Sequence, residues 1–174
     1  GENVILMSQN SLLDERDAAA IDEWYIEHLR NMSSVPGIFS AQRFKTSTAG
    51  LPRSVALYSV VSEKAFDNPY YHGIKGFGAM ASRIDEREHH VNLFAGLDEV
   101  PAVGDDECVL LADRAAPAGD IAGIAFTWLK CVGRDFSTPY RGIAIVAPDR
   151  LKSLDAAVAV YRPVTKRFGP PARA

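Results

Sequence analysis

The order of strand-like and helix-like segments limits most strongly what this chain can fold into. Alternation of apolar and polar residues predicts strands, and those of the first half are 3–8, 38–46, 53–61 and 90–96. A helix that begins after Asp14 and ends at Pro36-Gly37 separates the first two strands. A second helical region, in two pieces at 62–66 and 70–84, precedes the last strand. The predicted order is βαββαβ.

The second half repeats this pattern more faintly. Its predicted strands are 107–114, 125–132, 140–147 and 160–168. A helix is expected at 149–159, whereas the segment "AAPAGDIAG" has room for one helical turn only. Residues 54–68 and 141–155 each pass from an apolar strand into a helix start with the same phase. We therefore predict a duplicated unit, joined by the segment 98–106 and shortened at the first helix of its second copy.

Composition places the chain among ordinary globular domains. Of its 174 residues, 47% are hydrophobic and 24% are charged, which is enough apolar material for a sizeable core. The formal net charge of −3 and the scattered basic residues argue against a nucleic-acid partner, which requires a basic face. No apolar segment approaches the roughly 20 residues that cross a bilayer. The run from Val4 to Met7 lacks the basic flank of a signal peptide, so we expect a cytoplasmic protein with no membrane partner.

Several kinds of catalytic machinery are missing from the sequence. It has no GxGxxG, GxxxxGK[ST] or GxSxG motif, and its histidines and cysteines lack metal-ligand spacing. Cys108 and Cys131 fall in predicted strands, where we expect buried, reduced thiols. The prediction is therefore that no organic cofactor and no metal is bound.

The predicted first helix carries the most informative residues. A single stripe at spacings of 3 and 4 contains Ala18, Ile21, Tyr25, His28 and Met32. A buried histidine needs hydrogen-bond partners that a leucine would not, so we expect His28 to serve chemistry or ligand contact. The nearby helix C-terminus favours its protonated form and burial opposes it, which predicts a pKa near neutrality. A core histidine bonded to a backbone carbonyl is the alternative.

Three stretches of the chain resemble a known superfamily. They are the helix signature Trp24-Tyr25-x-x-His28, the run "VPGIFSAQRF" (35–44) and the segment "GFGAMASRIDEREHHVNLF" (76–94). Together with the βαββαβ order they resemble the dimeric α/β-barrel superfamily, and within it the EthD-like and antibiotic-biosynthesis-monooxygenase-like proteins. The resemblance covers residues 1–100 well and 101–168 by pattern only.

The resemblance implies an α+β fold of tandem ferredoxin-like βαββαβ repeats. Members of the superfamily pair two four-stranded antiparallel sheets into a barrel, usually across a dimer, with pockets between sheet and helices. Here a pseudo-dimeric barrel within one chain is implied. We expect an N-terminal repeat at 1–100 that carries the site, a degenerate C-terminal repeat at 101–168 and a tail at 169–174. A homodimer of the chain stays open.

Candidate site residues follow from the predicted faces. His28 is the first candidate for a catalytic acid or base, because histidine titrates near neutrality. His90 is the second, since it shares one side of its strand with Asn92, while His89 points oppositely and is expected in solvent. The residues expected to contact substrate are Trp24, Tyr25, Arg43, Tyr58, Tyr71, His72 and Asn92. Core packing, or a surface position, is the alternative for each of them.

Three functions are compatible with these observations. The first is a small cofactor-independent enzyme of lyase, isomerase or cyclase type, acting by acid/base chemistry on a hydrophobic or aromatic oxygenated metabolite. The second is a non-catalytic small-molecule-binding or stress-type module that uses the same pocket. The third is a cofactor-free or haem-assisted monooxygenase. All three predict a small-molecule partner, and fold alone does not choose among them.

Overall fold

The structure is a computed structural model that describes residues 2–154 and 157–173. Within this part of the chain, eight strands close into one barrel in the order β1-β3-β2-β8-β5-β7-β6-β4, and every neighbouring pair is antiparallel. The first four strands are β1 (Val4–Asn10), β2 (Ile38–Lys45), β3 (Ser54–Val60) and β4 (His90–Ala95). The last four are β5 (Cys108–Arg114), β6 (Thr127–Arg134), β7 (Tyr140–Val146) and β8 (Ala159–Pro163).

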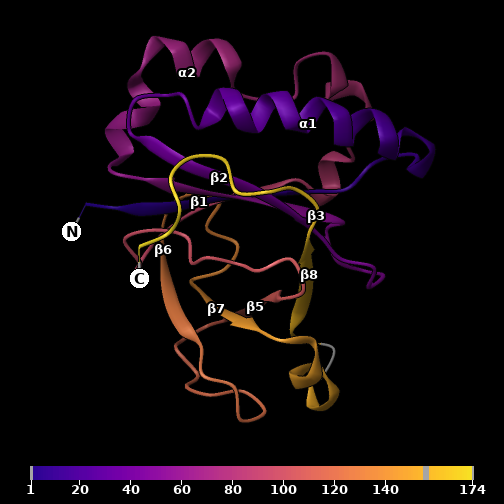
Figure 1. Ribbon diagram of the computed structural model, residues 1–174, viewed down its shortest axis with the longest axis vertical. Coiled ribbons are helices and arrows are strands. Elements are labelled where there is room, and N and C mark those ends of the chain that lie inside the picture. The colour runs from indigo at the N-terminus through magenta and orange to yellow at the C-terminus, as the bar shows by residue number, and fades with distance from the viewer. Residues whose placement is uncertain (1, 155–156, 174) are drawn as a thin grey trace.

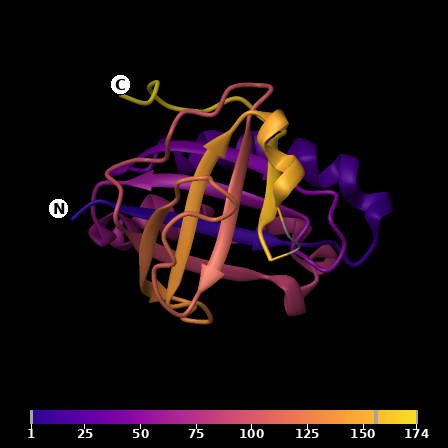
Figure 2. The same cartoon turned by 90° about the horizontal axis from the view of Figure 1, so that it is seen from below.

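The barrel consists of two four-stranded sheets. The N-sheet has the order β4-β1-β3-β2 and the C-sheet the order β6-β7-β5-β8, so both halves have the same strand order when counted within themselves. Figure 1 shows α1 (Ala18–Met32) and α2 (Pro69–Ile74) lying over the outer face of the N-sheet. Figure 2 shows the strands of the C-sheet running across those of the N-sheet. The predicted fold class is confirmed, whereas the division at residue 100 stays a prediction.

Three apolar clusters hold these layers together. One lies between the N-sheet and its helices, and another covers the outer face of the C-sheet under the loop that precedes β6. The third fills the barrel and takes residues from both sheets, among them Ile5, Met7, Phe44, Leu57, Phe94, Val109, Leu111, Leu129 and Tyr161. The barrel is therefore a packed core rather than a channel.

The core-facing stripe of α1 differs by one residue from the prediction. Its buried residues are Ile21, Tyr25, Leu29 and Met32, with Leu29 fully inaccessible to solvent. His28 is only partly buried and lies beside the stripe. The two neighbours are 100° apart on the helix, so Leu29 takes the core position while His28 is free to face a cavity.

Two predicted helices are shorter than expected. The region 70–84 forms α2 and then the 3-10 helix η3 (Gly78–Arg83), because Gly76 and Gly78 have positive φ angles that end a helix. The region 149–159 contains only the 3-10 helix η5 (Pro148–Ser153), and residues 155 and 156 lie outside the described residues. Ala159 already begins β8, because this segment pairs with β5 to complete the C-sheet.

Three further features concern the cysteines, the residues near the C-terminus and the length of the helices. Both cysteines are buried and free, as predicted. Arg173 near the C-terminus donates hydrogen bonds to the carboxylate of Glu99. No helix among the described residues is both long and apolar enough to cross a membrane.

Candidate functional site

A cavity of about 370 Å³ lies between the outer face of the N-sheet and the helices that cover it. We call it the His28 cavity. Strands β1, β3 and β4 supply its floor, and α1, α2 and the segment after α2 supply its walls. It is lined by Leu6, Ser8, Tyr25, His28, Met32, Tyr58, Tyr71, Lys75, Gly76, Phe77, His89, Val91 and Arg134.

His28 is held in the cavity wall by aromatic contacts alone. Its ring stacks on Trp24 with centroids 4.5 Å apart and planes 16° from parallel, and it meets the edge of Tyr25 at 5.8 Å. The predicted sharing of one helix face by these three residues is confirmed. Neither ring nitrogen has a hydrogen-bond partner within residues 2–154 and 157–173. The structure therefore lacks the backbone-carbonyl bond of the alternative interpretation.

Burial decides the charge of the two histidines in the cavity. It lowers the pKa of His28 to about 4, well below the neutral value that the sequence predicts. The C-terminal end of α1 would favour the imidazolium, but the desolvation of a charge in this aromatic wall outweighs that attraction. Burial, followed by the neighbouring charge of His90, also lowers the pKa of His89. Both rings are therefore neutral near pH 7 and able to accept a proton.

Tyrosines bring hydroxyl groups to the same space. Burial raises the pKa of Tyr58 well above its usual value, with Tyr25 adding to the effect, and burial also raises the pKa of Tyr25. The Tyr25 hydroxyl accepts a hydrogen bond of 2.8 Å from Asn10. Tyr71 packs on Phe66 with ring centroids 5.0 Å apart and is also buried. Tyr25 and Tyr58 keep their protons at neutral pH, so the cavity contains neutral donors beside neutral bases.

The only charged side chains that line the cavity, among the residues described, are the exposed cations Lys75 and Arg134. Neither forms an ion pair with a described carboxylate. Arg134 comes from β6 of the C-sheet and sits where the pairing of β4 with β6 shifts register. Its φ of 65° turns the chain, and its guanidinium lies 4.7 Å from the ring centroid of Phe66.

The orientation of β4 corrects the predictions for its histidines. Val91 and Leu93 face the helices, so His89 lies on the cavity side, and the expectation that it is in solvent is wrong. His90 lies on the other side of the sheet, near the barrel opening, with its Nδ1 3.1 Å from the Asp135 carboxylate. Asn92 is fully buried and donates to the Asp135 backbone carbonyl at 2.6 Å. The predicted roles of His90 and Asn92 beside His28 are therefore not supported.

The remaining predicted contacts divide between the cavity and other places. Tyr25, Tyr58 and Tyr71 line the cavity, and Trp24 supports His28 from behind. His72 is exposed on α2 and does not line it. Arg43 is buried on β2, where it donates to the Asp22 carboxylate at 2.6 Å and lies over the Tyr25 ring at 4.2 Å. Arg43 therefore contacts the back of the cavity wall rather than a bound substrate.

Sequence reasoning missed four polar lining residues, namely Ser8, Lys75, His89 and Arg134. Alternation on β1 could have identified Ser8, because it follows Leu6 on the helix-facing side. Nothing in the local sequence marks Arg134, which reaches the N-sheet only because the barrel closes between β4 and β6.

Comparisons with known proteins define the fold. No protein-family model and no curated protein matches the sequence. A provisionally named monooxygenase from Lactobacillus acidophilus NCFM superposes with a TM-score of 0.63 at 9% identity, over 99% of both chains. An anthrone oxidase-like protein superposes with a TM-score of 0.60 at 10% identity, over 99% of this chain and 96% of that one. A provisionally named chlorite dismutase superposes with a TM-score of 0.59 at 10% identity, over 95% of this chain and 96% of that one.

These likenesses extend over nearly the whole chain, although their sequence identities are too low to indicate an activity. The superposed residues span both sheets of the barrel. The two sheets also have the same strand order. The resemblance predicted from the helix signature is thus confirmed at the level of structure, and the chain has the dimeric α/β-barrel fold, with both sheets contributed by one polypeptide.

Proposed function

We propose that this chain is a small-molecule enzyme that removes a proton from an enolisable or phenolic aromatic compound bound in the His28 cavity. The observation that carries the proposal is a partly buried, neutral imidazole with unpaired nitrogens in an aromatic cavity that no carboxylate lines among the described residues. A proton taken up by His28 leaves an anion on the substrate, for which Lys75 and Arg134, the cations that line the cavity among the described residues, supply the counter-charge.

The chemistry follows from these charge states. His28 is electrically neutral near pH 7, and its low pKa makes it a weak base that takes a proton only from an acidic O–H or a strongly activated C–H bond. As the substrate becomes an enolate or phenolate, the imidazolium and the two cations stabilise its negative charge. Tyr58 keeps its proton at neutral pH and can donate a hydrogen bond to the developing oxyanion. The aromatic walls of Tyr71 and Phe77 fit a flat substrate.

The fate of the anion separates two kinds of enzyme. Reprotonation at another carbon or loss of a leaving group gives the lyase or isomerase chemistry expected from the residues. Reaction with dioxygen is the second candidate, and the names of the superposed monooxygenase and of the anthrone oxidase-like protein favour it. In that case a CH₂ group and O₂ form a hydroperoxide, which loses water to leave a carbonyl group.

Haem, which the haem-assisted monooxygenase considered above would require, does not suit the donor set around His28. A histidine that holds a metal usually donates its other ring N–H to a carboxylate or carbonyl, which orients the ring. His28 has no such acceptor among the described residues. The proposal therefore uses the side chains of the chain alone.

Deuterium exchange into anthrone tests the proton transfer directly. Anthrone is a flat compound with a CH₂ group made acidic by its carbonyl and two rings, and exchange in D₂O reports deprotonation whatever follows. We expect the wild-type protein to accelerate exchange under nitrogen, and His28→Gln to lose about 10²-fold or more of that acceleration. Oxygen consumption in air then distinguishes the oxygenase from the isomerase or lyase type.

His72→Gln is the matched control, because His72 is an exposed histidine outside the cavity. It should exchange anthrone at the wild-type rate. Equal exchange by wild-type and His28→Gln proteins would overturn the proposed role of His28. Binding of anthrone without any acceleration of exchange would instead identify a binding module.

A further inference from the structure

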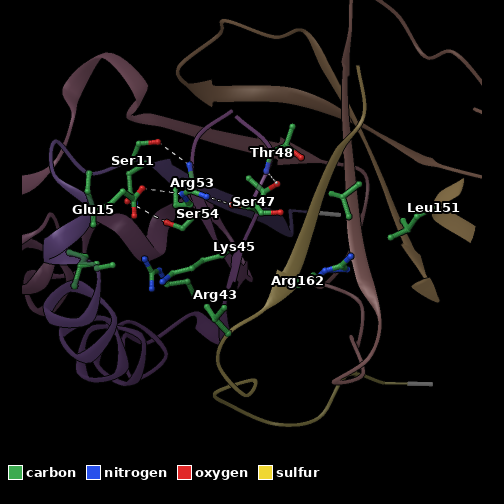
Figure 3. Close-up of a pocket in the computed structure, with 17 residues that line it drawn as sticks. Ser11, Glu15, Arg43, Lys45, Ser47, Thr48, Arg53, Ser54, Leu151 and Arg162 are labelled. Carbon is green, nitrogen blue, oxygen red and sulfur yellow. Dashed lines mark hydrogen bonds and ion pairs between the residues drawn. The ribbon is translucent and has the colours of Figure 1, made fainter. Parts of the chain in front are cut away.

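A second and larger cavity, of about 820 Å³, lies on the outside of the barrel where β2 meets β8. We call it the seam cavity. Figure 3 shows that its walls come from both halves of the chain, with Lys45 and Arg53 on the β2–β3 side and Leu151 and Arg162 on the other. It is lined by Asn10, Ser11, Leu12, Glu15, Ala18, Ile21, Arg43, Lys45, Thr46, Ser47, Thr48, Arg53, Ser54, Leu151, Val160, Arg162 and Val164.

Two cations lie at opposed positions on neighbouring strands that line this cavity. Lys45 of β2 and Arg162 of β8 are register partners in the short antiparallel pairing that closes the barrel. Like charges at directly opposed positions destabilise a sheet. The two side chains donate hydrogen bonds to different neighbours. Lys45 donates to the Asp22 carboxylate at 2.7 Å, and Arg162 donates to the Cys108 sulfur at 2.9 Å. An anion between them would relieve the repulsion.

The charges around the seam cavity leave an excess of positive charge. Four cations line it, namely Arg43, Lys45, Arg53 and Arg162, and among the described residues Glu15 is the single lining carboxylate, which bonds Arg53 at 3.1 Å. With Asp22 added, two described carboxylates stand against these four cations. Arg162 has no ion pair with a described carboxylate.

Arg43 provides a second sign that the positive charge is under-compensated. Its side chain is only 3% exposed, yet Asp22 is its one carboxylate partner within residues 2–154 and 157–173, at 2.6 Å. Its Nε is buried and has no hydrogen-bond partner in the same part of the chain. A buried guanidinium with an unsatisfied N–H is costly, and nearby negative charge reduces that cost.

The remaining lining is polar in one part, with Asn10, Ser11, Thr46, Ser47, Thr48 and Ser54, and apolar in another. Ile21 from α1, Leu151 from η5, and Val160 and Val164 from β8 and the residues after it lie beside the cations. The volume falls within the range of about 300–1,000 Å³ that holds small organic ligands, and is more than a lone inorganic anion requires.

From these contacts we propose that the seam cavity binds a small organic anion, with a phosphate or carboxylate head between Lys45 and Arg162 and an apolar body on Ile21, Val160 and Val164. The site is separate from the His28 cavity, with which it shares no lining residue. Its occupancy does not depend on the proposed deprotonation.

Calorimetric titration with hexyl phosphate tests the site, because this probe has a phosphate head and a flexible apolar body but no aromatic ring. We expect saturable binding that weakens as salt is added, since the attraction is between charges. Lys45→Met and Arg162→Met should each weaken it about tenfold, the scale of one charge-assisted hydrogen bond. Hexanoate and inorganic phosphate, titrated separately, distinguish a carboxylate head from a phosphate head and report the contribution of the apolar body.

Lys130→Met is the matched control, because Lys130 is an exposed lysine on β6 away from the seam, and it should bind hexyl phosphate as the wild type does. Saturating anthrone should not compete with the probe. Absence of binding to the wild-type protein, or equal affinity in the Lys45→Met and Arg162→Met variants, would overturn the proposal. Binding of inorganic phosphate as tight as that of hexyl phosphate would remove the apolar part of it. Amide chemical shifts of the wild-type protein, changing at 45–54 and 160–164 on addition of the probe, locate the site even if a variant fails to fold.

Discussion

At the scale of single residues, the neighbours His28 and Leu29 face different parts of the structure. Leu29 is inaccessible to solvent and belongs to the core, while His28 stacks on Trp24 and faces the cavity. A histidine here costs stability, since burial opposes its charged form and the described residues give its nitrogens no partner. A leucine would fit this aromatic wall without that cost, so the side chain is better explained by a ligand than by packing.

The lowered pKa of His28 makes a prediction about stability and pH. The unfolded chain takes up a proton near the ordinary pKa of 6.5, whereas folded His28 does so only near 4. The free energy of unfolding should therefore fall as the pH drops from about 6.5 to about 4, by up to about 3 kcal/mol from this group. Urea unfolding across this window should show a shallower dependence for His28→Gln. Identical slopes in the two proteins would contradict the burial of His28.

Arg134 allows stability and ligand binding to be separated. Its left-handed backbone costs a non-glycine residue about 1–2 kcal/mol, and its contact with Phe66 returns about 0.5–1 kcal/mol. Arg134→Gly should therefore unfold within about 1 kcal/mol of wild type, while binding of 4-nitrophenolate, followed by its absorbance, weakens about tenfold. Arg134→Lys should retain more of the affinity, because it keeps the charge. Wild-type affinity in the glycine variant would exclude Arg134 from the anion site.

At the scale of elements, helix α1 has a core face and a cavity face that substitutions can tell apart. Leu29→Ala removes a fully buried side chain and should cost about 2–5 kcal/mol in the free energy of unfolding. His28→Leu should cost less than about 1 kcal/mol, or stabilise the fold, because it removes an unpaired polar ring. Denaturant unfolding of both variants measures the contrast. A large decrease in the free energy of unfolding for His28→Leu, with a small decrease for Leu29→Ala, would reverse the assignment of the two faces.

The strands show how far the sequence predicts such faces. Alternation identified β4 and placed His90 opposite His89, but which side meets the helices is set by pairing with β1 and β6, which lie far away in sequence. The same limit hid Arg134, since its turn toward the cavity arises at a register shift between two distant strands. The apolar spacing of 149–159 predicts a full helix, but only the 3-10 helix η5 forms there, because β8 pairs with β5 from Ala159 onward.

At the scale of the whole molecule, the two halves share one interior. Ile5 and Phe44 of the N-sheet pack in the same cluster as Val109 and Tyr161 of the C-sheet. The Tyr161 hydroxyl donates to the Pro52 carbonyl at 2.7 Å and accepts from Gln9 at 3.3 Å, which ties β8 to the first half. The inner face of each sheet is therefore buried against the other sheet. The repeated strand order is the one expected if a single unit were duplicated and the two copies closed the barrel.

This shared interior predicts how the predicted repeats behave when separated. The full chain should unfold in one cooperative transition, with near-ultraviolet and far-ultraviolet circular dichroism changing together, because neither half can lose its partner and keep a buried inner face. A fragment of residues 1–100 would expose Ile5, Met7, Phe44 and Leu57 to water, so it should not persist as a folded monomer. Sedimentation velocity and circular dichroism of the fragment measure this. A native-like spectrum in a monomeric fragment would show that the first repeat is a self-sufficient domain, and that the barrel joins two independent folds rather than one.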